Sequence, residues 1–240
     1  MAKEKVFSRE EDNIYHTGEY FQKNPQYHVE DSLWKAQQIQ KLLFKQNLLV
    51  NSVCEIGCGG GEVLRQLQLQ MPQSSVFFGY EISPYAYEIC KSRENERLHF
   101  YLEDILVKDI KPVDLLLCLD VFEHVEDYLG FLRIVKQKAK YKIFHIPLDL
   151  SINSLLRYRS ILYAREKVGH LHYFMKVTAL ATLRDTGYQI IDYIYTPSSL
   201  DRGKGIKSKI AKLPRKVLYK INQDVAVRIL GGYSLLVLTH

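Results

Sequence analysis

The chain has 240 residues, of which 47% are hydrophobic and 25% are charged, and its formal net charge is +6. This length suits one domain with a full core, and no apolar run is long enough to span a membrane as a helix. The first residues are charged and no apolar stretch follows them, so we expect a cytoplasmic protein without a secretory signal. The cysteines lack zinc-type spacing, and we expect reduced thiols and no metal; they are Cys54, Cys58, Cys90 and Cys118.

Residues 1–27 are polar and rich in tyrosine, and we expect an irregular, partly ordered cap there. Residues 29–44 place apolar side chains at helical spacing, and Asp31 or Ser32 is the expected N-cap. This helix should precede the first strand and pack against the sheet.

A strand, a glycine turn and a helix form the central feature of the sequence. Residues 52–56 are an apolar run typical of a buried strand, and the turn that follows contains Gly57, Cys58, Gly59 and Gly61. Glycines permit positive φ and let a ligand approach the main chain. The helix start adds free N–H groups and a positive dipole end. The dinucleotide-binding pattern requires a glycine at position 62, but the chain has Glu62 there.

Strands alternate with helices along the rest of the chain. Further strands are predicted at 75–80, 98–102, 113–119, 141–146, 188–195 and 233–239, and helices at 62–71, 85–95, 125–139 and 177–186. This alternation predicts an α/β fold with a doubly wound, mostly parallel sheet and helices on both faces. We expect a single domain with a cap (1–27), a cofactor-binding core (28–197), a basic helical insertion (198–230) and a last strand (231–240). Residues 148–175 should bridge over the site.

Each of the first four predicted strands ends beside a carboxylate. These acids are Glu55, Glu81, Asp104 and Asp120. In parallel α/β sheets the ligand lies beyond the carboxyl ends of the strands, so the four acids should gather around one ligand. Glu55 is poorly placed beside a pyrophosphate but well placed for a cation or an amine.

Several segments resemble successive motifs of the class I S-adenosylmethionine-dependent methyltransferases, which have a Rossmann-like fold. They are Val53–Gly61, Gly79–Ser83, Asp104 and Asp120–Val125. Within this group, Glu123-His124-Val125 is typical of the small-molecule branch that includes ubiquinone and menaquinone biosynthesis methyltransferases. Residues 169–174 and 183–188 are also similar to this broad group of methyltransferases. The resemblance covers about residues 28–195, and it implies a seven-stranded sheet whose last strand is antiparallel.

The resemblance also implies S-adenosylmethionine as cofactor and S-adenosylhomocysteine as product. Glu81 lies about 20 residues past the glycine turn, where a carboxylate can accept both ribose hydroxyls. Ile82 would form an apolar wall for adenine. Asp104 would accept from the adenine amino group, near the Ile105 backbone. The amino group of the methionine moiety would meet the backbone of Leu119 and Asp120.

Methyl transfer needs an in-line approach of about 3 Å and exclusion of water, and an oxygen or nitrogen acceptor also benefits from a general base. The candidates are His124, His145, His170 and His172, of which His170 or His172 is favoured on the acceptor side. His124 follows the fourth strand at the pocket mouth, where it would either serve the acceptor side or pack against the cofactor and hold the loop. His170 and His172 should share one side of an extended segment. His145, inside a predicted strand, is expected to be a hydrogen-bonded core histidine instead.

Residues 202–220 carry many lysines and arginines and no acid. Apolar residues recur at helical spacing through this stretch, with Pro214 as a break; they are Ile206, Ile210, Leu213, Val217 and Ile221. Such a segment can pack on its own domain, lie on an anionic membrane, or meet an acidic or lipid-linked acceptor. Tyr219 is the one aromatic residue in this stretch, so the interleaved aromatics of a base-stacking surface are missing and nucleic acid is the least favoured partner.

Methyl transfer to an oxygen or nitrogen of a small acceptor, sugar-bearing or lipid-linked, is the favoured function. An oxidoreductase would require the missing glycine at position 62. A non-catalytic cofactor-binding protein on the same fold remains an alternative, as does an RNA methyltransferase. Many enzymes that methylate nucleic-acid amino groups carry Asn/Asp-Pro-Pro-aromatic after the fourth strand. This chain has Asp120-Val121-Phe122-Glu123 there, which disfavours a nucleic-acid methyltransferase of that kind.

Overall fold

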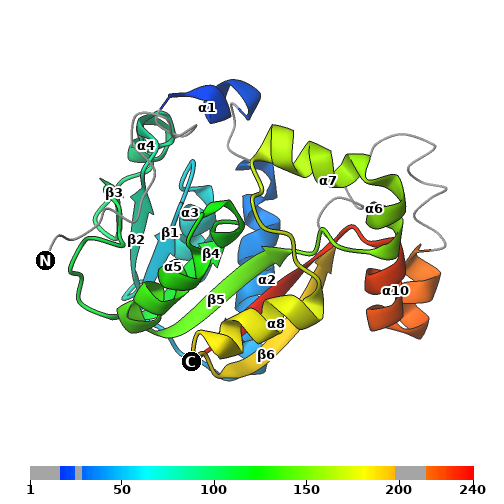
Figure 1. Ribbon diagram of the computed structural model, residues 1–240. Coiled ribbons are helices and arrows are strands. Elements are labelled where there is room, and N and C mark those ends of the chain that lie inside the picture. Colours follow the sequence, from blue (N-terminus) through cyan, green and yellow to red (C-terminus); the bar gives the residue numbers. More distant parts are fainter. Residues whose placement is uncertain (1–16, 25–28, 198–214) are drawn as a thin grey trace, which may run out of the picture.

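The computed structural model describes residues 17–24, 29–197 and 215–240. A seven-stranded sheet forms its centre, in the order β3-β2-β1-β4-β5-β7-β6 (Figure 1). The strands are β1 (Ser52–Ile56), β2 (Val76–Glu81), β3 (Leu98–Leu102), β4 (Val113–Leu119), β5 (Ala139–Pro147), β6 (Ile190–Pro197) and β7 (Tyr233–Thr239).

The first five strands pair in parallel, whereas β7 is antiparallel to both of its neighbours. This confirms the predicted sheet and the antiparallel last strand. The chain runs from β1 outward to β2 and β3 and then crosses back to β4 on the other side of β1. The carboxyl end of β1 therefore lies at the topological switch point, where ligands of such sheets bind.

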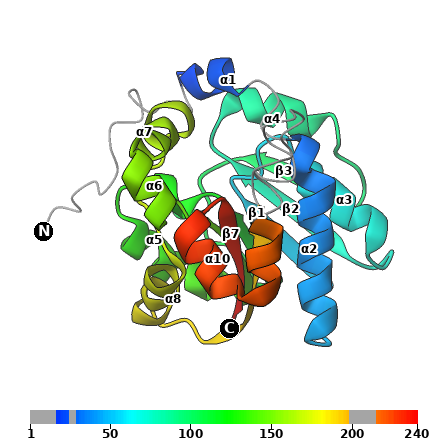
Figure 2. The same ribbon diagram turned by 90° about the vertical axis from the view of Figure 1, so that its right-hand side faces the viewer.

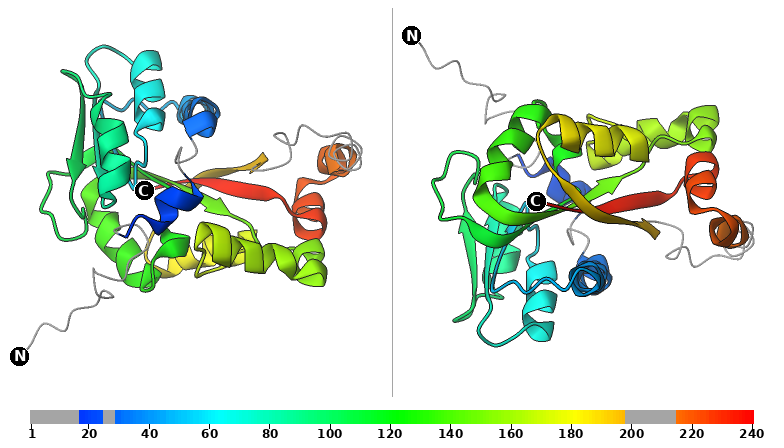
Figure 3. Two further views of the ribbon diagram at one scale, coloured as in Figure 1. Left: turned by 90° about the horizontal axis from the view of Figure 1, so that it is seen from above. Right: turned by 90° about the horizontal axis from the view of Figure 1, so that it is seen from below.

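Helices cover both faces of the sheet (Figure 3). One face packs against α2 (Ser32–Lys45), α3 (Glu62–Gln70) and α4 (Pro84–Lys91), and the other against α5 (Tyr128–Val135) and α8 (Lys176–Asp185). Successive side chains of β4 alternate between these two layers, with Leu115 and Leu117 in the first and Leu116 and Cys118 in the second. Both layers are fully buried, which explains the near-continuous apolar sequence of β4.

Several predicted boundaries were wrong by a few residues. The helix expected at 85–95 ends at Lys91, and Asn95 instead bonds Gln68 of α3 (2.6 Å). The helix expected at 125–139 begins only at Tyr128, because the Asp127 side chain accepts from the Gly130 N–H and caps it there. The strand expected from residue 188 begins at Ile190, since the side chain of residue 188 is buried against α5.

Two segments contain more helix than expected. The predicted irregular cap includes α1 (Glu19–Lys23), while residues 1–16 and 25–28 lie outside the described part. The bridge contains α6 (Ile152–Arg157), α7 (Arg159–Tyr163) and a π-helical turn (Ala164–Val168). Of the basic insertion, residues 198–214 lie outside the described part; residues 215–221 and α10 (Gln223–Leu230) are helical.

Candidate active site

The turn between β1 and α3 depends on left-handed backbone at three glycines. Gly57, Gly59 and Gly61 have φ values of 62°, 54° and 71°, a region that residues with a Cβ rarely adopt. The Gly57 N–H donates to the Tyr80 carbonyl (2.8 Å), so the turn crosses the end of β2. A Cβ at Gly61 would lie 2.5 Å from the Phe100 ring. Gly61 therefore permits close helix–strand packing, while the other two glycines shape the turn.

Glu81 fastens this turn to β2. Its Oε2 accepts from the Gly59 N–H (2.8 Å), and its Oε1 accepts from the N–H groups of Ile82 (2.9 Å) and Ser83 (2.8 Å). Burial raises the pKa of this carboxyl, and the three N–H groups oppose that shift. A carboxylate offers about four acceptor positions, so Glu81 keeps capacity for a further donor.

Glu55 is a buried carboxyl at the end of β1, with 3% of its surface exposed. Among the described residues, none forms a hydrogen bond with its Oε2. Burial raises the pKa of Glu55 to about 8; Lys35 lowers it and Glu81 raises it. An unsatisfied buried carboxyl is costly, and a cationic or amino group of a ligand would remove that cost. This geometry fits the role expected for Glu55.

A chain of polar contacts crosses the ends of β4, β5 and β6. The Lys35 ammonium of α2 lies 2.7 Å from Asp120 Oδ2, and Asp120 Oδ1 lies 2.7 Å from His145 Nδ1. His145 Nε2 is 2.8 Å from the Thr196 hydroxyl, which confirms His145 as a hydrogen-bonded core residue. Burial opposes ionisation of Asp120, but His145 and Lys35 outweigh it and hold its pKa well below the usual range.

Sequence reasoning missed Lys35 and Thr196. Lys35 lies in α2, which the sequence reveals only through its apolar face, and no motif marks this lysine as a site residue. Burial lowers its pKa, but the charge and hydrogen bond of Asp120, together with the charges of Glu55 and Asp31, outweigh burial and leave the pKa raised. Asp120 itself has φ of 56°, which is uncommon for a residue with a Cβ.

Two of the predicted histidines, His124 and His170, meet beyond β4 beside the short helix η3 (Phe122–His124). The rings of His124 and His170 are 5.0 Å apart in an edge-on arrangement. His172 lies apart from them: its Nε2 donates to the Val125 carbonyl (2.9 Å) and its ring packs on Tyr128. Burial and His170 lower the pKa of His124 to about 4, so this imidazole is neutral at physiological pH.

Glu123 completes this group, and the sequence analysis did not assign it a role. Its side chain is fully buried, and within the described ranges neither carboxylate oxygen has a hydrogen-bond partner. Burial and the neighbouring Asp120 raise its pKa well above the ordinary value. The side chains of Glu123, His124 and His170 each offer one atom that could bind a metal ion, and these three atoms lie within 4.8 Å of one another.

The other predicted cofactor residues lie at or just after the ends of β1, β3 and β4. Ile105 and Leu119 are buried, and Asp104 accepts from the Leu106 N–H (2.8 Å), which closes the loop after β3. A hydrogen bond with Cys90 and burial raise the pKa of the Cys58 thiol well above its ordinary value, so this cysteine is chemically inert. Asp104 lies after the edge strand, farther along the sheet than the other three acids.

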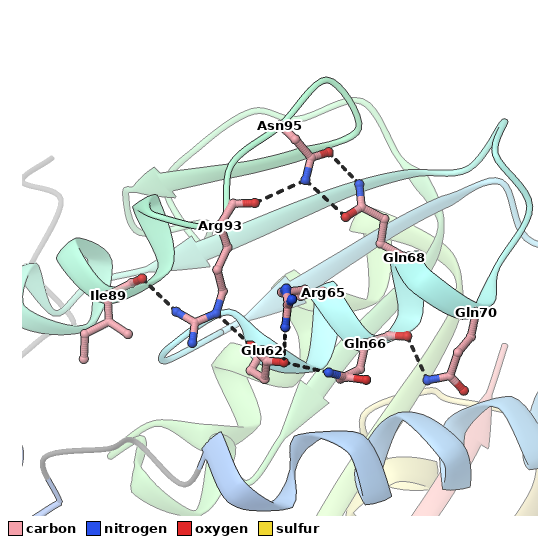
Figure 4. Close-up of polar contacts among 8 residues, drawn as sticks. All are labelled: Glu62, Arg65, Gln66, Gln68, Gln70, Ile89, Arg93 and Asn95. Atoms are coloured by element: carbon pink, nitrogen blue, oxygen red, sulfur yellow. Dashed lines mark hydrogen bonds and ion pairs between the residues drawn. The ribbon is translucent and has the colours of Figure 1, made fainter.

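Polar contacts tie the start of α3 to α4 (Figure 4). Glu62 Oε2 accepts from Arg93 Nε (2.8 Å), and Glu62 Oε1 accepts from Arg65 (2.9 Å) and Gln66 (2.7 Å). Arg93 also donates to the Ile89 carbonyl of α4 (2.8 Å). Glu62 directly follows Gly61, so these contacts hold the helix that begins at the glycine turn.

The cap helix α1 lies over α4 (Figure 1). The Phe21 and Tyr85 rings stack with centroids 5.4 Å apart. A hollow of about 610 Å³ is lined there by Phe21, Pro84, Tyr85, Glu88 and Ile89. The cap therefore reaches the segment directly after Glu81 and Ser83, beside the expected adenosine position.

Solved structures of methyltransferases share this fold. Magnesium protoporphyrin IX methyltransferase from Synechocystis PCC 6803 with bound SAH is 15% identical, with a TM-score of 0.58 over 86% of this chain and 82% of that chain. A cyclopropane synthase from Mycobacterium tuberculosis is 14% identical, with a TM-score of 0.62 over 98% and 99%. The N-methyltransferase NodS from Bradyrhizobium japonicum WM9 with SAH is 14% identical, with a TM-score of 0.54 over 85% and 84%. No curated protein sequence matches the chain.

Fold and site together define a class I S-adenosylmethionine-dependent methyltransferase. The chain belongs to the family described as Methyltransferase domain, which it matches over residues 28–193. The narrower ubiquinone-like branch is not distinguished by this match. In the described ranges, no helix combines the length and the apolar character that a membrane span requires.

Proposed function

We propose that the protein transfers a methyl group from S-adenosylmethionine to an oxygen or nitrogen atom of a small, lipid-linked or sugar-bearing acceptor. The observation that carries the cofactor assignment is the Glu81 carboxylate, which is bonded to the glycine turn and can accept one further donor. Glu55 adds an unsatisfied buried carboxyl at the switch point. Bound S-adenosylmethionine supplies a sulfonium methyl group. The protein's residues hold the cofactor, exclude water and present the acceptor.

The acceptor side lies around η3 and the bridge, where histidine and tyrosine side chains gather. These side chains combine apolar area with polar tips, which suits a partly polar small molecule. The rings of His172 and Tyr128 pack together with centroids 4.3 Å apart. We assign His124, His170 and His172 to this side of the site.

One exposed surface supports a lipid-linked acceptor. The helices α6, α7 and α10 and residues 215–221 lie together at one end of the molecule (Figure 2). Asn153 of α6 and Arg215 both donate to the Leu230 carbonyl at the end of α10 (3.3 Å each). We call this the basic-apolar surface, and its exposed apolar residues are Ile152, Leu155, Leu156, Tyr158, Leu162, Tyr163, Val217, Ile221, Val225 and Ile229.

Cations interleave with these apolar side chains. Residues 152–168 contain four lysines and arginines and one acid, and residues 215–230 contain four and one, so the surface carries 8 − 2 = +6. Exposed leucines and tyrosines among cations favour an anionic membrane surface. The segment 148–151 joins the carboxyl end of β5 to α6, so an acceptor held in a membrane there would approach the acceptor side of the site.

Calorimetry with S-adenosylhomocysteine tests the cofactor assignment. Glu81→Gln should bind S-adenosylhomocysteine about tenfold to hundredfold more weakly than the wild type, because it loses a charged hydrogen-bond acceptor for the ribose. Glu96→Gln, which changes an exposed glutamate before β3, is the matched control and should bind like the wild type. Equal affinity of Glu81→Gln would remove Glu81 from the ribose site, and binding of NAD without S-adenosylhomocysteine would overturn the proposed function.

A further inference from the structure

We propose that Glu123, His124 and His170 form a binding site for a divalent transition-metal ion of the Zn²⁺ class. Cysteine spacing in the sequence predicted no metal site. The three side chains come instead from η3 and from a segment far along the chain, and only the fold brings them together. Their candidate ligand atoms lie within 4.8 Å of one another.

Glu123 supplies the observation that points to a ligand. Its carboxylate is fully buried and lacks any hydrogen-bond partner among the described residues, although buried polar atoms are nearly always paired. Its Oε1 lies 3.9 Å from His124 Nε2. Ligands of a tetrahedral ion are about 3.4 Å apart, given metal–ligand bonds of about 2.1 Å. The candidate ligand atoms lie up to 4.8 Å apart, so a contraction of up to about 1.4 Å around an ion would satisfy the carboxylate.

Each imidazole is oriented as metal-binding histidines usually are. His124 Nδ1 donates to the Gly169 carbonyl (3.0 Å), and His170 Nδ1 donates to Asp149 Oδ2 (2.7 Å). These contacts place the proton on Nδ1 and leave Nε2 as the basic nitrogen in both rings. A carbonyl or carboxylate that accepts from the second nitrogen fixes the tautomer of a metal ligand and raises its basicity.

The ligand set selects the class of ion. Two imidazoles and one carboxylate suit Zn²⁺ and its neighbours in the first transition series, whereas Mg²⁺ and Ca²⁺ prefer oxygen alone. Three protein ligands leave at least one coordination position open. In the function proposed above, an acceptor hydroxyl bound there would lose its proton to water more readily. Its oxygen would then form the C–O bond while the methyl–sulfur bond breaks and sulfur keeps the electron pair. This role rests on that function, but the ion site itself does not.

Metal binding by untagged, chelator-treated protein tests the site directly. We expect one Zn²⁺ per chain in equilibrium dialysis, and a Co²⁺ complex with visible absorption that Zn²⁺ displaces. Glu123→Gln is nearly isosteric and should weaken binding at least about 100-fold, as should His170→Gln. Asp149→Asn removes only the carboxylate behind His170, so an intermediate loss of about tenfold to 100-fold is expected. His172→Gln, two residues from His170 but bonded to a carbonyl outside the cluster, should bind Co²⁺ normally.

Wild-type protein that binds no stoichiometric Co²⁺ or Zn²⁺ would overturn the site. So would unchanged binding by both Glu123→Gln and His170→Gln. Calorimetry with S-adenosylhomocysteine on the same samples shows that each variant is folded. It also separates the two proposals: metal binding without S-adenosylhomocysteine binding would overturn the proposed function alone, and the reverse result would overturn the metal site alone.

Discussion

The buried carboxyl of Glu55, beside the glycine turn, makes the stability of the fold depend on pH. Its ordinary pKa of 4.5 is raised to about 8 in the folded protein by burial, with Lys35 on α2 and Glu81 on β2 as its charged neighbours. Between these pH values the folded protein holds one proton more than the unfolded chain, so the free energy of unfolding falls as pH rises. The stabilising contribution of the neutral carboxyl is complete below about pH 4.5 and disappears as pH rises through about 8.

Glu55→Gln should therefore remove this pH dependence. We expect wild type and variant to unfold alike in urea at pH 4, and the variant to be more stable at pH 8.5 by up to about 4 to 5 kcal/mol, because each pKa unit corresponds to about 1.4 kcal/mol. The free energy of unfolding, measured without ligand across this range, checks the prediction. Glu96→Gln should follow the wild-type curve, and parallel curves for Glu55→Gln and wild type would show that Glu55 ionises normally.

At the scale of elements, the glycine turn is held by the helices on either side of it. Glu62 begins α3 at the positive end of the helix dipole and bonds both Arg65 within its helix and Arg93 beyond α4. Hydrogen bonds to Gln66, Arg93 and Arg65 outweigh the effect of burial and lower the pKa of Glu62. The two arginines differ in exposure, at 48% for Arg65 and 19% for Arg93.

This difference predicts unequal effects on stability. Arg93→Ala should lower the free energy of unfolding by about 1–2 kcal/mol, because it removes a shielded tie between two elements. Arg65→Ala breaks an exposed pair within one helix and should cost at most about 0.5 kcal/mol. Urea unfolding of both variants, alone and combined with Glu62→Gln, measures the coupling energies. Equal losses for the two arginines would contradict a tie between α3 and α4.

At the scale of the molecule, charge is distributed unevenly. Residues 152–168 and 215–230, which form the basic-apolar surface, carry a net charge of +6, as much as the whole chain. It also presents exposed leucines, such as Leu156, which is 80% exposed. Apolar side chains and cations on one end of the molecule are the combination that anionic bilayers attract.

Vesicle sedimentation tests this surface. We expect binding to vesicles containing anionic phospholipid, little binding to neutral ones, and a loss with added salt. Leu156→Ser should weaken binding severalfold, since it removes buried apolar area at the lipid boundary. Leu49→Ser is the matched control, because Leu49 is 93% exposed in the loop before β1, at the amino ends of the parallel strands and outside the basic-apolar surface. Equal loss in both variants, or equal binding to neutral vesicles, would contradict membrane docking.

Local pattern was enough to predict most of the fold. The glycine turn, the strand–helix alternation and the acids at four strand ends are readable because each depends on neighbours in sequence. Parallel pairing then carries the acids after β1, β2 and β4 to one edge. Helix ends were less readable: the start of α5 depends on the Asp127 cap, and the loop after α4 depends on Asn95 meeting Gln68.

By itself the sequence determined the strand–helix alternation and the glycine turn, because hydrophobic periodicity and glycine spacing act over a few residues, and the resemblance of its motifs indicated the class of protein. Only the tertiary structure decided which polar side chains meet. Lys35 reaches Asp120, Asp120 holds His145, and Glu123 and His124 face His170. Each of these contacts joins elements far apart in the chain, and their energy depends on burial and orientation that no spacing encodes.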